Sequence, residues 1–308
     1  MSFSVPTFDL HDGTKIPTLG WGNGTGDAKK TAVESGKIAL GAGIRHIDTA
    51  QGYDNEEETG QSISNSAVPR AELFVTSKLS QKEGNPDNAP IPVADAQKAV
   101  QSTIHRLGFH PNLLLIHNPF LAPKGEMLAF WRVLEEMKDK GELESSIGVS
   151  NFRPQDFEGF LDQVKYKPVV NQLEYHPYLL EQLEPLLKIQ EKHGIRTEAY
   201  GPLTPLLRHP TGGPIKPILE RIAKRISSET GKDVDAAGAL LLWTRAKGVV
   251  AVTASGNEGR IKKLAEVQTL PELKPEEVEE IDTAGRKLHF RSYDEHMRDF
   301  AVPNLPSQ

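Results

Sequence analysis

Short apolar runs alternate along the chain with longer segments whose apolar residues recur at helical spacing. Strands that are apolar throughout, without polar alternation, are typical of a parallel sheet buried on both faces. The eight candidate strands are PTLGWG (17–22), IRHIDTA (44–50), LFVTSKL (73–79), LLLIHN (113–118), SSIGVSN (145–151), VVNQLEY (169–175), RTEAYGP (196–202) and VVAVTAS (249–255).

Helical periodicity between these runs predicts helices such as residues 29–43, 93–108, 127–142, 179–194 and 214–231. Several of these segments end in glycine, which is favoured just after a helix because it adopts the left-handed conformation easily. Eight alternations of strand and helix over about 250 residues predict a closed (β/α)8 TIM barrel. We expect one barrel domain spanning residues 1–308.

Three segments outside this alternation carry signals of their own. Residues 8–17 predict an N-terminal β-hairpin, with Asp12 and Gly13 in a tight turn whose two central residues both have positive φ. Residues 85–92, rich in proline and asparagine, predict a loop. We expect residues 289–308 to form a C-terminal loop over the barrel mouth, and a disordered tail is the alternative. Its candidate pocket residues are Arg291, Tyr293, His296 and Phe300.

A doubly wound open sheet is the rival fold. It calls for a glycine-rich turn after its first strand, and GWGNGTG (20–26) resembles such a turn. The context does not fit, because no long apolar strand precedes the glycines and no acidic residue closes a second strand as expected. The barrel is therefore the better interpretation.

Composition narrows the class of protein. Of the 308 residues, 37% are hydrophobic and 25% charged with both signs mixed, which predicts a packed core. A net charge of −6 argues against binding to nucleic acid or an anionic membrane. The absence of cysteine excludes disulfides, thiolate catalysis and cysteine-ligated zinc. The N-terminus resembles no signal peptide and no apolar run reaches 18 residues, so we expect a cytoplasmic protein.

Candidate chemistry lies where the predicted strands end, because the carboxyl ends of barrel strands surround the active site. Asp48, Lys78 and His117 close three successive runs, and Tyr53 follows Asp48 in the next loop. A tyrosine is a poor proton donor, with a pKa of about 10. A lysine ammonium beside it favours the phenolate, a carboxylate orients that lysine, and a histidine can donate to a carbonyl oxygen. These four side chains could protonate an oxygen that gains charge during carbonyl reduction.

Each of the four residues also has a plainer interpretation. Lys78 could snorkel to solvent, Asp48 could cap the next helix, Tyr53 could be a rim aromatic, and His117 could be a hydrogen-bonded core histidine. Their placement at successive strand ends favours the functional interpretation. A metal site is not expected, since the strand ends offer a single histidine and no His-x-His pair.

Six ordered motifs carry a family resemblance: HIDTAQGYDNEEETG, LFVTSKL, LLLIHNP, IGVSNF, VVNQLEYHPY and AYGPL. Over nearly the whole chain they resemble the aldo-keto reductases. The resemblance implies a barrel without a Rossmann domain, NADPH as cofactor, hydride transfer to an aldehyde or ketone, and Tyr53 as general acid within the tetrad of Asp48, Tyr53, Lys78 and His117.

The same resemblance implies a set of cofactor-binding residues. Ser150, Asn151 and Gln172 match the positions that hold the nicotinamide carboxamide, although Asn151 could instead cap a helix and Gln172 could be a buried structural amide. Tyr200 matches the ring that stacks on the nicotinamide. The remaining cofactor positions, which include Asp48, are Gly24, Thr25, Gly201, Pro202, Leu203, Thr253, Ser255, Gly256, Asn257, Arg260 and Lys263.

Departures from the family pattern concern cofactor and substrate. In VTASGNEGRIKKL (252–264), Ala254 replaces the usual lysine, while Ser255 and Arg260 remain. Arg260 could form a two-pronged contact with a 2′-phosphate. Lys263 could supply the missing charge or lie on a solvated helix face.

Two tryptophans that are usual in the family are absent, and this sequence offers Trp21, Asn118 and Phe120 as substrate-binding candidates. The changes resemble a fungal branch that includes conjugated polyketone reductases and α-keto amide reductases. That resemblance implies activated dicarbonyl substrates such as ketopantoyl lactone, isatin, α-keto amides or α-keto esters. The alternatives are a polyol-forming aldose, xylose or glycerol-type reductase and a non-catalytic NADPH-binding regulatory subunit. We expect a monomer, the family's commoner habit.

Overall fold

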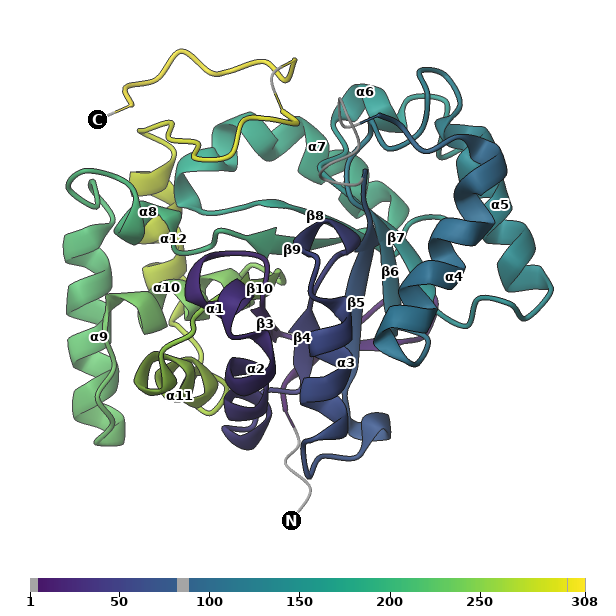
Figure 1. Cartoon of the computed structure of the whole chain (residues 1–308). Helices are drawn as coiled ribbons and strands as arrows, with labels where there is room; N and C mark the ends of the chain where they lie inside the picture. Colours follow the sequence, from purple (N-terminus) through teal and green to yellow (C-terminus); the bar gives the residue numbers. More distant parts are fainter. Residues whose placement is uncertain (1–4, 82–88, 298, 308) are drawn as a thin grey trace.

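The computed structural model describes residues 5–81, 89–297 and 299–307. Eight parallel strands close into a barrel in the order β10-β3-β4-β5-β6-β7-β8-β9 (Figure 1). The strands are β3 (Leu19–Gly22), β4 (His46–Asp48), β5 (Phe74–Leu79), β6 (Leu113–Ile116), β7 (Ser146–Ser150), β8 (Val170–Glu174), β9 (Arg196–Tyr200) and β10 (Val250–Thr253). Each lies within one of the eight apolar runs, so the predicted barrel is confirmed.

Helices surround the barrel in Figure 1. They are α1 (Gly26–Lys30), α2 (Ala32–Gly41), α3 (Glu56–Ser64), α4 (Ala96–Leu107), α5 (Met127–Asp139), α6 (Pro154–Phe157), α7 (Leu180–His193), α8 (Thr204–Leu207), α9 (Lys216–Thr230), α10 (Ala236–Ala246), α11 (Glu258–Val267) and α12 (Pro275–Gly285). Short 3-10 turns are η1 (Gln51–Tyr53), η2 (Arg70–Glu72), η3 (Val93–Asp95) and η4 (Pro177–Leu179). Gly108, Gly194 and Gly231 adopt the left-handed conformation after α4, α7 and α9, as the helix-end signal predicts.

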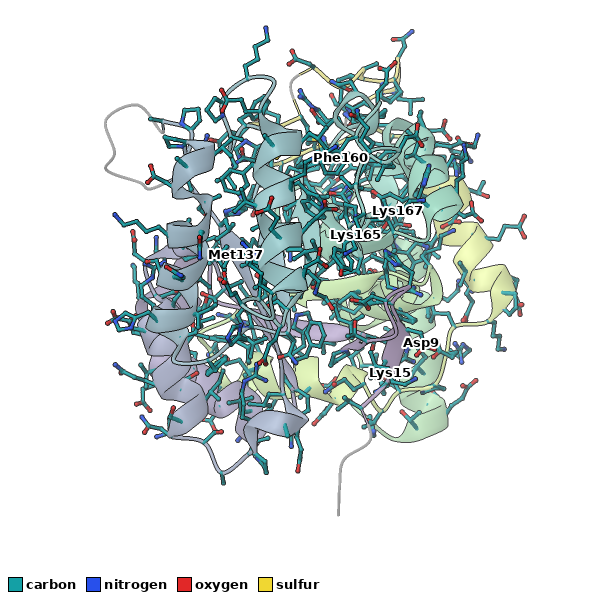
Figure 2. The ribbon with its side chains drawn as sticks, turned by 90° about the vertical axis from the view of Figure 1, so that its right-hand side faces the viewer. Asp9, Lys15, Met137, Phe160, Lys165 and Lys167 are labelled. Carbon is teal, nitrogen blue, oxygen red and sulfur yellow. The ribbon has the colours of Figure 1, made fainter. Side chains whose placement is uncertain are left out.

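The N-terminal hairpin is present, but its predicted turn is wrong. Strands β1 (Thr7–Asp9) and β2 (Lys15–Pro17) pair antiparallel, and an ion pair of 2.6 Å joins Asp9 to Lys15 (Figure 2). Only Gly13 has positive φ, at 89°, whereas Asp12 does not. The Gly13 N–H donates to the Leu10 carbonyl, which makes a three-residue connection ending in a left-handed glycine.

This hairpin closes the amino-terminal end of the barrel. Ile16 is fully buried against residues at strand starts, including Leu113, Val170 and Val250. Apolar side chains fill this end of the barrel, and the active sites of such barrels lie at the opposite end, where the strands finish.

The C-terminal segment crosses that opposite end of the barrel in Figure 1. The Glu174 carboxylate, at the end of β8, accepts hydrogen bonds from the backbone N–H groups of Ser292 and Tyr293, both at 3.0 Å. Phe300, further along, is buried in the core. These contacts confirm the predicted loop over the barrel mouth.

Of the predicted loop at 85–92, residues 85–88 lie outside the described residues. Residues 89–92 have no regular structure, and Ile91 N–H donates to the Leu121 carbonyl at 2.7 Å. Among the helices that the structure describes, none combines the length and the apolar character needed to cross a membrane.

Candidate active site

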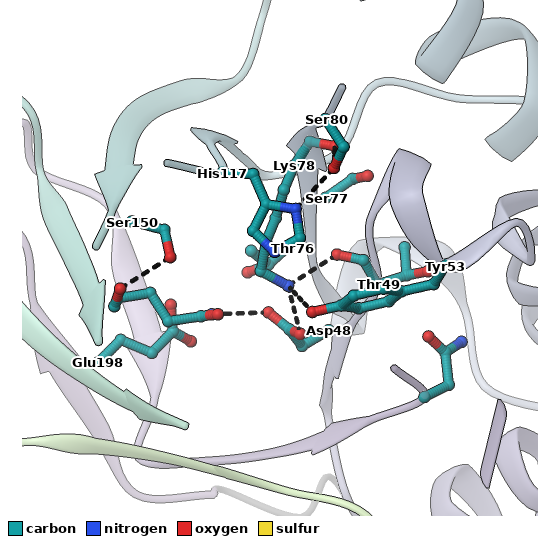
Figure 3. Close-up of polar contacts among 12 residues, drawn as sticks. Asp48, Thr49, Tyr53, Thr76, Ser77, Lys78, Ser80, His117, Ser150 and Glu198 are labelled. Carbon is teal, nitrogen blue, oxygen red and sulfur yellow. Dashed lines mark hydrogen bonds and ion pairs between the residues drawn. The ribbon is translucent and has the colours of Figure 1, made fainter. Parts of the chain in front are cut away.

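Lys78 lies at the centre of the site, in contact with two of the other predicted residues (Figure 3). Its Nζ donates to Asp48 Oδ1 at 2.6 Å, to the Thr49 carbonyl at 2.9 Å and to the Tyr53 hydroxyl at 3.3 Å. The His117 ring packs edge-on against the Tyr53 ring, with centroids 5.7 Å apart. The structure therefore brings together the four residues that the strand-end argument selected.

Burial and pairing together determine the charge of Lys78. Its side chain is fully buried, which lowers its pKa, but the hydrogen-bonded Asp48 carboxylate chiefly outweighs that effect and raises the pKa above the usual value. A buried ammonium is tolerated only when partners compensate for lost hydration, and Asp48 Oδ1 and the Thr49 carbonyl do so here. Lys78 is thus a permanent positive charge beside the phenol.

Tyr53 receives opposing influences. Burial raises the pKa of its hydroxyl, while the neighbouring Lys78 lowers it. Because burial is the larger effect, the pKa of Tyr53 lies above the usual value. Lys78 lowers the pKa of Tyr53, as the sequence predicts. The burial of the phenol, which raises this pKa, has no signal in the sequence. Gly24 permits the close packing, because a Cβ there would lie 2.6 Å from Tyr53 Cζ.

His117 is held by a residue that the sequence analysis did not select. Its Nδ1 lies 2.6 Å from Ser80 Oγ. Burial lowers the pKa of His117 well below the usual value, so the ring is neutral at neutral pH. When Ser80 donates to Nδ1, the single ring proton sits on Nε2, where it can be offered to a substrate oxygen.

Three predicted carboxamide-binding residues cross-link the strand ends. Asn151 Nδ2 donates to the His117 carbonyl at 3.0 Å, and its Oδ1 accepts from the Tyr200 hydroxyl at 2.7 Å. Ser150 Oγ donates to the Gln172 carbonyl, and Gln172 Nε2 donates to Asp48 Oδ2 at 2.8 Å. Asn151 is no helix cap, since α6 begins after Arg153. Asn151, Gln172 and Tyr200 line the cleft, whereas Ser150 is buried and is not among the residues that line it.

The cleft consists of two adjoining cavities of about 480 Å³ each. The first contains Asp48, Tyr53, His117 and Tyr200. The second contains Arg260 and Lys263. Residues common to both are Thr25, Leu203, Leu207, Thr253 and Ala254. Gly24, Gly201 and Pro202 line the first cavity, and Ser255 and Gly256 line the second. The shape suits an elongated ligand that reaches from the tetrad to Arg260.

The second cavity has positively charged residues suited to binding an anion, but part of their charge is neutralised. Arg260 Nε donates to Ser255 Oγ at 3.2 Å, next to the amino-terminal end of α11. Asn257 caps that helix by accepting from the Arg260 N–H, so its oxygen is already used. Lys263 does not extend freely into solvent, because its Nζ donates to Asp233 Oδ2 at 2.6 Å. Asp233 thus offsets part of the positive charge that Lys263 brings.

The predicted substrate-binding residues do not line the described cleft. Strand alternation directs Gly20 and Gly22 inward, so Trp21 points outward, where it is buried and donates to the Ser255 carbonyl. Asn118 is buried and accepts from the Phe120 N–H, which stabilises its own loop. Phe120 is 42% exposed and lies 6.2 Å from the His296 ring at the rim. The outward direction of Trp21 does not fit a substrate-binding role, while the assignments of Asn118 and Phe120 stay predictions.

The C-terminal loop supplies the wall instead. Residues 292–296 line the first cavity, and the Tyr293 ring lies edge-on to Tyr200 with centroids 5.4 Å apart. Two other residues proposed for the pocket do not line it: the Arg291 side chain, 7% exposed, donates to Gln182, and Phe300 is in the core. Within the described ranges, no three His, Asp or Glu side chains are grouped so that they could hold a metal ion.

Comparison with known proteins places this geometry in context. The sequence model of the family described as "Aldo/keto reductase family" matches residues 17–286. An NAD/NADP-dependent indole-3-acetaldehyde reductase of Schizosaccharomyces pombe is 35% identical over 295 residues, covering 92% of this chain and 97% of the relative. Morphine 6-dehydrogenase of Pseudomonas putida is 32% identical, covering 93% and 94%.

Solved structures give the same picture. An aldo/keto reductase from Brucella melitensis superposes with a TM-score of 0.75 at 34% identity, covering 91% of this chain and all of the other. A Bombyx mori aldo-keto reductase, solved in complex with NADP, gives a TM-score of 0.75 at 28% identity, covering 92% and 93%.

Proposed function

The chain belongs to the aldo/keto reductase family, and we propose that it is an NADPH-dependent reductase of activated carbonyl compounds, with Tyr53 as the general acid. The observation that carries the proposal is the contact of Lys78 with both Asp48 and Tyr53. That contact supports proton donation from Tyr53, since a regulatory NADPH-binding protein would need cofactor contacts but no charged lysine against a phenol.

The chain's own residues supply the proton and place the substrate oxygen. Tyr53 donates its hydroxyl proton as the oxygen gains charge, and Lys78 stabilises the phenolate that remains. Neutral His117 donates a hydrogen bond from Nε2 to the same oxygen. Asp48 is held by Lys78 on one oxygen and by Gln172 on the other, so it keeps the ammonium directed at Tyr53.

The cleft fits NADPH by the polar groups at its two ends. Asn151, Gln172 and Tyr200 would hold the nicotinamide end, and Arg260, Ser255 and the amino-terminal end of α11 would hold the adenosine phosphate. When bound, NADPH supplies the hydride that reduces the carbonyl carbon. The complexes of structural neighbours with NADP and NADPH support this choice of cofactor.

Activated dicarbonyls are the substrate class that we favour. An electron-withdrawing neighbour makes a carbonyl a better hydride acceptor, and the resemblance to the fungal polyketone and α-keto amide reductases points to this class. The likeness to a fungal indole-3-acetaldehyde reductase supports a fungal type of enzyme without naming the substrate. A polyol-forming aldose, xylose or glycerol-type reductase is the second candidate.

A substrate panel tests the proposal. NADPH oxidation is measured with ketopantoyl lactone, isatin, an α-keto ester, D-xylose and glyceraldehyde, and each assay is repeated with NADH. We expect turnover of the dicarbonyls with NADPH. Preference for xylose or glyceraldehyde would favour the polyol-forming alternative, and NADPH binding without any turnover would favour the regulatory one.

A further inference from the structure

A second buried acid lies inside the barrel below the four tetrad residues (Figure 3). Glu198, on β9, is fully buried. It precedes Tyr200 by two residues, so both side chains are on the inward face of the strand, with Glu198 one layer deeper. Gln172 of β8 is its register partner. The proton-donor scheme above assigns Glu198 no task.

The groups that face Glu198 come from several strands. His46 and Asp48 belong to β4, Lys78 to β5 and Gln172 to β8. His46 Nε2 lies 3.6 Å from Glu198 Oε1 and 2.9 Å from Thr76 Oγ1. Gly20 makes room for this ring, since a Cβ there would lie 2.9 Å from His46 Nδ1.

Among the described residues, neither carboxylate oxygen of Glu198 has a hydrogen-bond partner. The nearby Gln172 amide favours the charged form, but it gives its hydrogen bond to Asp48. An ionised carboxylate without hydrogen bonds is costly to bury, whereas a protonated one is far less so. Burial first and the Asp48 charge second raise the pKa of Glu198 to about 8. Burial also lowers the pKa of His46 to about 4, so this histidine is neutral too.

We propose that Glu198 is a positioning residue of the reduction: as an uncharged acid beneath the Asp48–Lys78 pair, it leaves the lysine with one carboxylate partner and so keeps the ammonium directed at the Tyr53 hydroxyl. This inference rests on the proposed function. Above about pH 8, Glu198 ionises, and its carboxylate then attracts the Lys78 ammonium in competition with Asp48. The added negative charge raises the pKa of Tyr53, which weakens the phenol as an acid and slows proton donation.

Infrared titration of the wild-type protein tests the protonation state without any turnover. We expect a carboxylic-acid C=O band at pH 6 that disappears with a midpoint near pH 8 and is missing in Glu198→Gln. Absence of the band from the wild type at pH 6, or its persistence in the variant, would overturn the proposal. The wild-type titration tests the protonation of Glu198 even if the variant does not fold. It needs no turnover, so its result holds even if the protein does not catalyse the proposed reaction.

The pH profile of kcat tests the positioning role, at saturating NADPH and the best substrate of the panel. In the wild type we expect kcat to fall on the order of three- to tenfold between pH 7 and pH 9.5. A rise of up to about one unit in the pKa of Tyr53 would slow proton donation by this much. Glu198→Gln should stay flat over this range. The matched control is Glu135→Gln, a buried glutamate that accepts from the Lys165 and Tyr166 N–H groups far from the site and should keep the wild-type profile. Identical profiles for wild type and Glu198→Gln would overturn the role.

Discussion

Single hydrogen bonds decide which protons the site can give. The Asp48 carboxylate is held from both sides, by Lys78 on Oδ1 and by Gln172 on Oδ2. The neutral His117 ring is held at Nδ1 by Ser80. A donor that is already oriented loses little freedom when substrate binds, so we expect these supporting contacts to contribute to the rate as well as to stability.

Replacing Ser80 by alanine should lower kcat by roughly fivefold, since a net hydrogen bond contributes about 1 kcal/mol. Without the Ser80 hydroxyl, the His117 proton is no longer directed to Nε2. Steady-state kinetics with the best dicarbonyl substrate would measure the change. Ser77→Ala is the control: Ser77 lies on β5, which ends just before Ser80, but it donates to Glu56, away from the cleft. Equal values of kcat for Ser80→Ala and Ser77→Ala would show that Ser80 does not support the role of His117.

The tetrad could be predicted because Asp48, Lys78 and His117 close apolar runs and Tyr53 follows Asp48 in the next loop, so the barrel topology brings these residues together. Ser80 and Glu198 could not be predicted in this way. Their roles depend on how deeply they are buried and on which side chains surround them, and the spacing of residues along the sequence shows neither. Trp21 was misplaced for a different reason. A two-residue periodicity places Gly20 and Gly22 inward and Trp21 outward, so a substrate-binding role for Trp21 does not fit the strand alternation.

At the level of secondary-structure elements, strands and helix ends were predictable because they depend on local residue types. The hairpin was also found, yet its turn was misjudged: Asp12 and Gly13 suggested a two-residue turn, whereas only Gly13 adopts positive φ. The Asp12 side chain accepts from Thr14 N–H and from Ser146 Oγ, which anchors the turn to β7. A contact with a strand more than a hundred residues away has no local signature.

The pairing of Lys263 on α11 with Asp233, ahead of α10, leads to a prediction about cofactor choice. Asp233→Asn should release Lys263 and lower the KM for NADPH relative to that for NADH by about two- to fivefold, since a partly exposed charge contributes roughly 0.5–1 kcal/mol. The KM ratio for the two cofactors measures it. Asp139→Asn, which breaks an exposed lysine pair with Lys165 elsewhere, should leave the ratio unchanged. An unchanged or smaller NADPH preference in Asp233→Asn would contradict this interpretation.

At the level of the whole molecule, the hairpin closes one end of the barrel and the C-terminal loop covers part of the other, so the ionisable groups inside are shielded from water. Two of them, Glu198 and His46, give stability an opposite dependence on pH. The pKa of Glu198 is raised from 4.5 to about 8 in the folded state, so its contribution is full below pH 4.5 and is lost as the pH rises to 8. The pKa of His46 is lowered from 6.5 to about 4, so its contribution is full above pH 6.5 and is lost as the pH falls to 4.

The two effects oppose each other between pH 4.5 and 6.5, and Glu198 acts alone of the pair above pH 6.5. The wild-type Tm should therefore fall between pH 6.5 and 8, and Glu198→Gln should show a smaller fall. Thermal unfolding followed by circular dichroism at several pH values measures both. Parallel curves for the two proteins would mean that Glu198 does not titrate in this range.

The most direct test of the account compares wild type with Tyr53→Phe in two assays, NADPH oxidation with an activated dicarbonyl and NADPH binding by protein fluorescence. Phenylalanine keeps the ring that packs against Gly24 and His117 but removes the proton. We predict that kcat falls by about a thousandfold or more, because general acid catalysis contributes up to ~10⁴-fold, while the Kd for NADPH changes by less than about threefold. Substantial reductase activity in Tyr53→Phe would contradict the assignment of Tyr53 as the proton donor.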